Sequence, residues 1–192
     1  MAIKAIIGLG NPGKEYEHTR HNAGEDFVIA LAEQFGGHFK KEDRFFGMTA
    51  TATIHHQAIR LLLPGTYMNR SGQAVAALSN FYRIETDEIL VVHDELDLAP
   101  GTARLKKAGG HGGHNGLRDI ISSLGNNNGF LRLRIGIGHP GQARQVSSYV
   151  LKKPPPDEQL LIRQSMEDAL RVIPDLIKGD WEKATRDLHS LK

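Results

Sequence analysis

Segments with the pattern of strands alternate with segments with the pattern of helices along the whole chain, and this alternation limits the folds available to it. Short apolar runs indicate strands, and apolar residues spaced three or four apart indicate helices. The predicted strands are residues 3–9, 48–55, 58–63, 89–92, 102–106 and 131–138, and the predicted helices are residues 22–35, 71–82 and 116–124. Residues 157–192 have a helical pattern that we expect Pro174 and Gly179 to divide. Such interleaving is typical of the α/β class, here a mixed, mostly parallel twisted sheet flanked by helices.

Length and composition favour one domain without disulfides. The 192 residues, 40% of them hydrophobic, suffice for one well-buried domain but not for two of ordinary size. No repeat or linker divides the chain, so we expect a single domain over residues 1–192. The absence of cysteine excludes disulfides and thiolate metal sites and suits a reducing compartment. The apolar stretch 3–9 is interrupted by Lys4 and is too short for a signal-peptide core or a membrane span.

The first strand runs into GLGNPG, residues 8–13, which fits the G-x-G-x-x-G template of a dinucleotide-binding loop. That template also needs a helix starting at the second glycine and an acidic residue closing the next strand. Here Pro12 favours a turn, the following run KEYEHTR has no apolar stripe, and the acidic residue at a suitable distance, Glu33, lies on a predicted helix. A sharp turn after a strand is therefore favoured over a nucleotide site. Such a turn leaves Asn11 and the run Thr-Arg-His-Asn, residues 19–22, unexplained.

Polar side chains follow four of the predicted strands. In an open α/β sheet the working groups gather outside the carboxyl ends of the strands, so we expect these residues to share one rim. The polar residues are Asn11, Tyr16, His21, Asn69, His93, Asp94, Glu95, Asp97, His111, His114 and Asn115, and the apolar Met68 lies among them.

Several of these residues also have ordinary structural interpretations. Asn69 and Asn115 stand at the starts of predicted helices, where asparagine is a good N-cap. His21 taken alone fits a hydrogen-bonded loop histidine, and Glu95 and Asp97 fit solvated or structural charges.

A metal site is an open alternative. His93, Asp94, His111 and His114 supply ligand types that divalent metals bind. However, H-x-x-H in a glycine-rich loop has no fixed geometry, unlike two histidines on one face of a helix. The spacing therefore favours a site without metal.

Taken together, the loop sequences are far more specific than any one of them. The chain resembles the bacterial-type peptidyl-tRNA hydrolase family in five segments, in order: GLGNPGKEYEHTRHNAG, PGTYMNRSG, HDELDLAPG, GGHGGHNGLRDI and RLRIGIGHPG. Beyond Pro154 the likeness rests on length and helical pattern. The resemblance implies a monomeric, cytoplasmic esterase without metal or cofactor. Its substrate would be peptidyl-tRNA released prematurely from ribosomes, with neither DNA nor a membrane as partner.

The resemblance also implies roles for individual residues. It suggests His21 as the catalytic histidine and Asp94 as its partner. The residues that it implies in contact with substrate are Asn11, Met68, Asn69 and Asn115, and those lining the site are Tyr16 and His114.

These residue types suit the hydrolysis of an ester between a peptide and a ribose hydroxyl. A neutral imidazole near pH 7 is a suitable general base for water, and a carboxylate can orient the ring and stabilise the imidazolium. No G-x-S-x-G motif is present, so direct attack by water is the simpler mechanism. Asparagine amides donate and accept hydrogen bonds without charge and can hold a peptide backbone of any sequence.

Basic residues recur with a period of two in the last two predicted strands. Arg132 and Arg134 are expected on one face of their strand, and Arg104 and Lys106 on one face of theirs. Such ladders are usually solvated charge, and a pI near 8.9 with a net charge of +2 adds little. The family resemblance implies instead that Lys106 and Arg134 clamp a tRNA phosphate. A rival interpretation is an RNA-binding module without catalysis, in which the histidine loops are structural.

Overall fold

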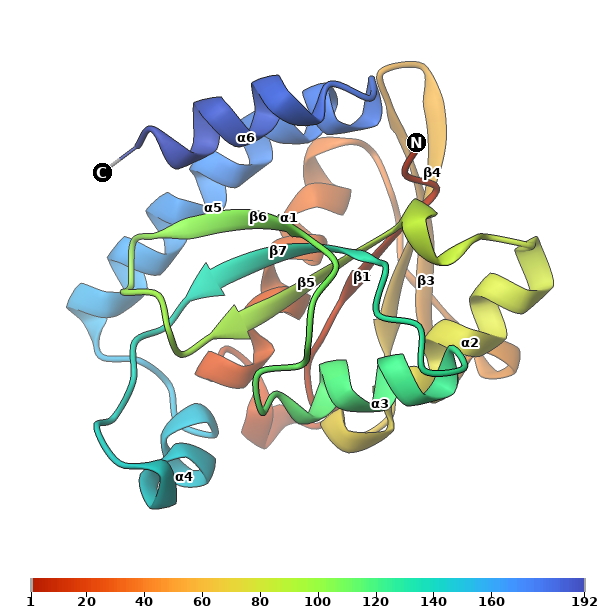
Figure 1. The fold of residues 1–192 in the computed structure, drawn as a ribbon. Coiled ribbons are helices and arrows are strands. Elements are labelled where there is room, and N and C mark those ends of the chain that lie inside the picture. The colour runs from red at the N-terminus through yellow and green to blue at the C-terminus, as the bar shows by residue number, and fades with distance from the viewer. Residues whose placement is uncertain (1, 192) are drawn as a thin grey trace.

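One sheet organises the molecule. In the computed structural model, which describes residues 2–191, seven strands form this sheet in the order β2-β3-β4-β1-β5-β7-β6 (Figure 1). The strands are β1 (Ala5–Gly8), β2 (Lys40–Glu42), β3 (Gly47–Ile54), β4 (Gln57–Pro64), β5 (Ile89–Glu95), β6 (Ala103–Lys107) and β7 (Leu131–Gly136). Strands β4, β1, β5 and β7 are mutually parallel, β2 runs in their direction, and β3 and β6 run against them. The prediction of a single domain with a mixed, mostly parallel sheet is confirmed.

Helices cover both faces of the sheet. They are α1 (Ala23–Gln34), α2 (Ser71–Tyr82), α3 (Asn115–Ser123), α4 (Val146–Val150), α5 (Pro156–Ile177) and α6 (Trp181–His189). Helices α1, α5 and α6 pack on one face of the sheet and α2 and α3 on the other, so two apolar cores form (Figure 1). Neighbouring residues Ile6 and Ile7 of β1 are both fully buried, one in each core, as expected for a central parallel strand. None of the helices within residues 2–191 has the length and apolar character needed to cross a membrane.

The glycines after β1 allow α1 to approach the strand closely. A Cβ atom on Gly8 would lie 2.6 Å from the carbonyl oxygen of Gly24, and one on Gly10 would lie 2.9 Å from Cγ of Asn22. Because these distances are shorter than real Cβ contacts, a larger residue at either position would push α1 away from the sheet. Helix α1 begins at Ala23 and not at the second glycine, so the favoured prediction of a turn is correct.

Two boundaries differ from the sequence prediction in ways that affect the site. Strand β5 continues to Glu95, so His93 and Asp94 lie within the strand and not in the loop after it. Helix α5 passes through Pro174 to Ile177, because proline in the last turn removes a single backbone hydrogen bond while Ile173 and Ile177 stay buried. Gly179 does separate α5 from α6.

Two elements were missed because they lack an apolar pattern. Strand β2 is a three-residue edge strand of charged residues, Lys-Lys-Glu, paired with β3. Helix α4 has five residues, of which Val150 is buried. The β3–β4 hairpin turns at His55 and His56, which both have positive φ, at 48° and 62°. This is the requirement of the type I′ turn, so these two histidines have a local structural role.

Candidate active site

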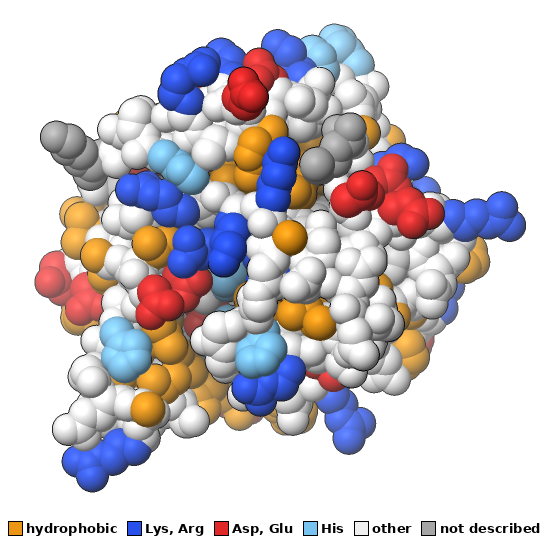
Figure 2. Space-filling model, in the orientation of Figure 1, with side chains coloured by type: hydrophobic (Ala, Val, Ile, Leu, Met, Phe, Trp, Pro, Cys, Tyr) orange, Lys and Arg blue, Asp and Glu red, His pale blue; other side chains and the backbone are white. Residues whose placement is uncertain are grey.

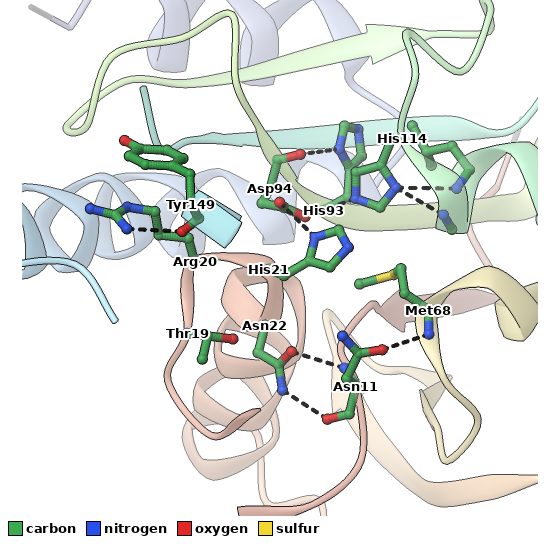
Figure 3. A network of polar contacts seen from close by, with 12 residues as sticks. Asn11, Thr19, Arg20, His21, Asn22, Met68, His93, Asp94, His114 and Tyr149 are labelled. Atoms are coloured by element: carbon green, nitrogen blue, oxygen red, sulfur yellow. Dashed lines mark hydrogen bonds and ion pairs between the residues drawn. The ribbon is translucent and has the colours of Figure 1, made fainter. Parts of the chain in front are cut away.

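A histidine and a buried aspartate meet where β1, β5 and the start of α1 come together. His21 lies in the 3-10 helix Arg20–Asn22 that leads into α1. Its Nδ1 donates a hydrogen bond of 2.9 Å to Oδ2 of Asp94, and the side chains are 12% and 2% exposed respectively (Figure 3). Because a carboxylate only accepts, the neutral ring of His21 carries its proton on Nδ1 and keeps a lone pair on Nε2.

A second histidine holds the other carboxylate oxygen. His114 is the N-cap of α3, where its Nδ1 accepts hydrogen bonds from the backbone N–H groups of Gly116 (3.1 Å) and Leu117 (3.3 Å). Its proton is therefore on Nε2, which donates to Oδ1 of Asp94 at 2.8 Å. Asp94 thus bridges two imidazoles that precede two different helices.

The charges of this group are mutually dependent. Burial by itself favours the protonated form of Asp94, but its interactions with His21 and His114 outweigh burial and hold the pKa of this carboxyl well below its usual range. Burial by itself lowers the pKa of His21, but the charge and hydrogen bond of Asp94 outweigh it and raise this pKa above the ordinary value for histidine. The pair therefore combines a fixed negative charge with an unusually basic imidazole.

His93 lies beside this group but does not hold the carboxylate. Alternate residues of a strand point to opposite faces, so the 2% exposed ring of His93 leaves β5 on the face opposite Asp94 and packs edge-on against His114, with 5.2 Å between the ring centroids. Its Nδ1 donates to the backbone oxygen of Asp94 at 2.8 Å. Burial lowers the pKa of His93 to about 3, so the ring stays neutral and has a structural role in β5.

The ligand set of the metal alternative differs from the one expected. Within residues 2–191, three histidine and carboxylate side chains have their ligand atoms within 4.8 Å of one another, and these are His21, Asp94 and His114. His93 and His111 are outside this group. Both oxygens of Asp94 already accept from the imidazoles, and the second nitrogen of His114 is bonded to α3. An ion here would have to displace those protons, so the group fits a hydrogen-bonded relay better than a metal centre.

His21 lies between two openings. One is a cleft of about 220 Å³, and the other is a pocket of about 90 Å³. The cleft is lined by Asn11, His21, Tyr67, Met68, Asn69, Asn115, Ser147, Val150 and Leu151. The pocket is bounded by β5, the glycine-rich loop before α3 and helix α4. Figure 3 shows His21 between Asp94 and His114 on one side and Asn11 and Met68 on the other. The structure therefore brings together all four residues expected to contact substrate.

Asn11 is held in one orientation. Its Oδ1 accepts a hydrogen bond of 2.6 Å from the backbone N–H of Met68, which leaves its amide nitrogen as a donor at the cleft. Its backbone N–H donates to Oδ1 of Asn22 at 2.9 Å, and its backbone oxygen accepts from Nδ2 of Asn22 at 3.0 Å. The side-chain amide of Asn22 thus satisfies both backbone groups of Asn11, as a neighbouring strand would. This contact gives a structural role to Asn22, which the sequence left unexplained.

The other amides at the cleft are not helix caps. His114 caps α3, so Asn115 is the first helical residue, with an exposed side chain. Asn69 precedes α2 by two residues, and its side chain is also exposed. The capping interpretation is therefore wrong for both asparagines. Tyr16 does not line the cleft itself but packs edge-on against Tyr67, which does, with 6.3 Å between the ring centroids.

Arg20, which the sequence analysis did not single out, fastens α4 beside His21. Its Nη1 donates to the backbone oxygen of Tyr149 at 2.9 Å, and the carbon of its guanidinium lies 3.8 Å from the centroid of the Tyr149 ring. Its backbone N–H donates to the oxygen of Lys152 at 3.0 Å. These contacts place Val150 and Leu151 in the wall of the cleft. The available sequence signal was an arginine directly before the expected catalytic histidine.

The basic face is smaller than the sequence predicted. Arg132 is 2% exposed, and its guanidinium donates to backbone oxygens that include that of Gly110 at 2.7 Å. Arg132 therefore supports the glycine-rich loop and is not part of an exposed ladder, so that expectation was wrong. Arg104 and Arg134 are directly paired across β6 and β7, and Lys106 follows on the same face. Figure 2 shows Lys and Arg side chains gathered over this part of the sheet.

Arg134 is tied to the edge of the pocket. Its Nε donates to Oε1 of Glu95 at 2.9 Å. Glu95 is the last residue of β5 and lines the pocket beside His21. The basic side chains of β6 and β7 are therefore continuous with the pocket, on the side of His21 away from the amide-lined cleft.

The fold and site together define a class of protein. It is a single α/β domain in which a buried carboxylate orients a basic histidine at a cleft lined by amides, an arrangement suited to activating water. A family model described as peptidyl-tRNA hydrolase matches residues 5–192. The chain belongs to this family.

Individual members of this family are similar to the chain over nearly its full length. A protein of Teredinibacter turnerae named peptidyl-tRNA hydrolase is 61% identical over 98% of this chain and 97% of its own length. One of Saccharophagus degradans with the same name is 62% identical over 98% and 95%. The crystal structure of peptidyl-tRNA hydrolase from Acinetobacter baumannii superposes with a TM-score of 0.96 at 49% identity, covering 99% of this chain and 96% of that one.

The replacement Asp94→Asn should lower the pKa of His21, because the amide keeps the shape of the carboxylate but removes the negative charge that favours the imidazolium. An NMR titration of the imidazole resonances measures this directly. Asp97→Asn, which removes an exposed carboxylate from the loop after β5, is the matched control. A folded Asp94→Asn protein in which His21 titrates at the wild-type pH would contradict direct coupling.

Proposed function

We propose that this chain hydrolyses the ester bond between the peptide and the tRNA of peptidyl-tRNA, which frees tRNA from prematurely released chains. The observation that carries the proposal is the 2.9 Å hydrogen bond between His21 and Asp94 at the mouth of an amide-lined cleft. Membership of a family whose curated members are named for this activity supports the same substrate.

In the proposed mechanism a water molecule attacks the ester carbonyl carbon. The lone pair on Nε2 of His21 accepts a proton from this water as the new carbon–oxygen bond forms. Asp94 stabilises the resulting imidazolium and keeps Nε2 directed at the cleft. When the tetrahedral intermediate collapses, the bond to the ribose oxygen breaks and the imidazolium returns the proton to that oxygen. The products are a free carboxyl group on the peptide and a free hydroxyl on the tRNA.

The amides of the cleft suit the peptide half of the substrate. The Asn11 amide nitrogen is a donor held beside His21, because its oxygen is occupied by Met68. Neutral amide donors can stabilise a developing oxyanion or a peptide carbonyl without selecting side chains. Of the three asparagines that line the cleft, Asn11 is the most firmly oriented, and we therefore assign its amide nitrogen to a carbonyl oxygen of the bound peptide.

The basic side chains on β6 and β7 suit the tRNA half. Lys106 is exposed, and Arg134 keeps its terminal nitrogens outside its ion pair with Glu95. A phosphate bound there would place the ribose end of the substrate near the pocket beside His21, with the peptide in the cleft beyond. We propose a monomeric, cytoplasmic enzyme that needs no metal or cofactor.

The main rival is an RNA-binding protein without catalysis. His21→Asn distinguishes the two, because asparagine retains a donor for Asp94 but has no basic nitrogen. We expect hydrolysis of N-blocked aminoacyl-tRNA to fall by roughly 10²- to 10⁴-fold, the usual contribution of a general base. Thermal unfolding should stay close to that of the wild type. The exposed His38→Asn is the control, and turnover near the wild-type rate in His21→Asn would remove this residue from the mechanism.

Metal independence has its own test. Hydrolysis should persist after dialysis against a chelator, because both oxygens of Asp94 and both nitrogens of His114 are already hydrogen-bonded within the protein. The assay should use a minimal N-blocked aminoacyl ester as well as tRNA, since chelation also perturbs folded RNA. Activity that is lost with the chelator and restored by a divalent ion would instead assign His21, Asp94 and His114 as ligands.

The double variant Lys106→Ala/Arg134→Ala tests the RNA surface. If both residues bind phosphate and neither contacts the reacting ester, KM for tRNA substrates should rise while kcat is retained. The slope of log affinity against log salt should fall by somewhat under one unit for each lost contact. Lys41→Ala/Arg163→Ala removes the same charge from exposed positions elsewhere and serves as the control. Equal loss on tRNA and on a minimal ester would instead place Lys106 and Arg134 in support of the catalytic group.

A further inference from the structure

The contacts that hold Asn11 continue beyond the cleft to a carboxylate on α1. Nδ2 of Asn22 donates not only to the backbone oxygen of Asn11 but also to Oε2 of Glu25, at 3.2 Å. Glu25 is half-buried in the first turn of α1. A Cβ atom on Gly10 would lie 2.9 Å from Cγ of Asn22 and 3.1 Å from Cβ of Glu25, so this glycine lets both side chains pack against the loop.

This arrangement selects one orientation of the Asn22 amide. With Oδ1 toward the backbone N–H of Asn11 and Nδ2 toward its backbone oxygen, both groups are satisfied. A flipped amide would set donor against donor and acceptor against acceptor. An acceptor at Glu25, on the Nδ2 side, stabilises the satisfied orientation further because a hydrogen bond to a charged group is stronger than a neutral one.

We infer that Glu25 is a positioning residue for substrate binding: its carboxylate fixes Asn22, and through Asn22 it fixes the Asn11 amide that faces the cleft. This inference rests on the proposed function, since it assigns Asn11 to the substrate. No contact of Glu25 with the cleft is involved. Its influence passes through two hydrogen-bonded side chains.

The surroundings of Glu25 make the contact sensitive to pH near neutrality. Burial, with the neighbouring charges of Asp26 and Glu17, outweighs the hydrogen bond from Asn22 and the charge of His18 and raises the pKa of Glu25 to about 7. His18 itself pairs with Asp26 at 3.2 Å. Below this pKa the protonated carboxyl is a weaker acceptor, and its O–H can donate to Oδ1 of Asn22 in competition with Asn11.

A purely structural role makes a different prediction. Acidic residues in the first turn of a helix stabilise it through the helix dipole. If that were the whole role of Glu25, its removal would lower the thermal transition but would leave the pH dependence of KM as it is in the wild type.

The experiment compares wild type, Glu25→Gln, Glu25→Ala and the control Glu33→Ala, which removes an exposed charge from the last turn of the same helix. KM and kcat for N-blocked aminoacyl-tRNA are measured at pH values on both sides of 7. We expect the wild-type KM to fall as pH rises through this range. Glu25→Gln, whose amide oxygen accepts at any pH, should lose this dependence. Glu25→Ala should raise KM by roughly three- to tenfold with little change in kcat.

A second readout is independent of activity. The side-chain amide resonances of Asn22, followed by ¹⁵N NMR, should titrate with a midpoint near 7 in the wild type and in Glu33→Ala but not in Glu25→Gln. If these resonances titrate as expected but the wild type hydrolyses no ester, the proposed function is wrong and the contact to Asn11 stands. If they do not titrate, or if Glu25→Ala leaves KM at the wild-type value, the inference is overturned.

Discussion

The site depends on the burial of one negative charge. Asp94 is 2% exposed in the last part of β5, and a carboxylate in such a place would be strongly destabilising without partners. Its two oxygens accept from His21, two residues before α1, and from His114, the N-cap of α3. The same two hydrogen bonds therefore stabilise the charge, fix the tautomers of both rings and hold the starts of two helices against the centre of the sheet.

Hydrogen bonds from side chains to the backbone hold the segments around this carboxylate in place. Arg20 and Arg132 are both buried, and they donate to backbone oxygens of segments that border the site, Arg20 to α4 and Arg132 to the glycine-rich loop. The side-chain amide of Asn22 accepts from the backbone N–H of Asn11 and donates to its backbone oxygen. Side chains that satisfy loop backbone groups replace the ladders that regular structure would provide, so the groups at the cleft are fixed in position before a substrate enters.

Particular residues show how far the sequence could be interpreted. The strands and helices with apolar patterns were predicted to within a few residues, and the polar residues at the strand ends were expected at one rim. Strand β2 was missed because Lys-Lys-Glu has no pattern and pairs only as an edge. Arg132 was misplaced, because the period of two gives its face of the strand but does not show that a glycine-rich loop covers that face. Asn69 and Asn115 could not be assigned as caps or site residues from their positions alone.

The sequence by itself determined the alternation of elements, the class of sheet, the family and the set of polar residues outside the strand ends. These follow from local periodicity and from motifs, which are properties of neighbouring residues. The tertiary structure alone decided which nitrogen of each histidine carries its proton, which asparagine is fixed, which arginine is buried and which carboxyl titrates near 7. Each of these depends on hydrogen-bond partners and burial contributed by residues far apart in the chain, and such contacts exist only once the sheet has brought its loops together.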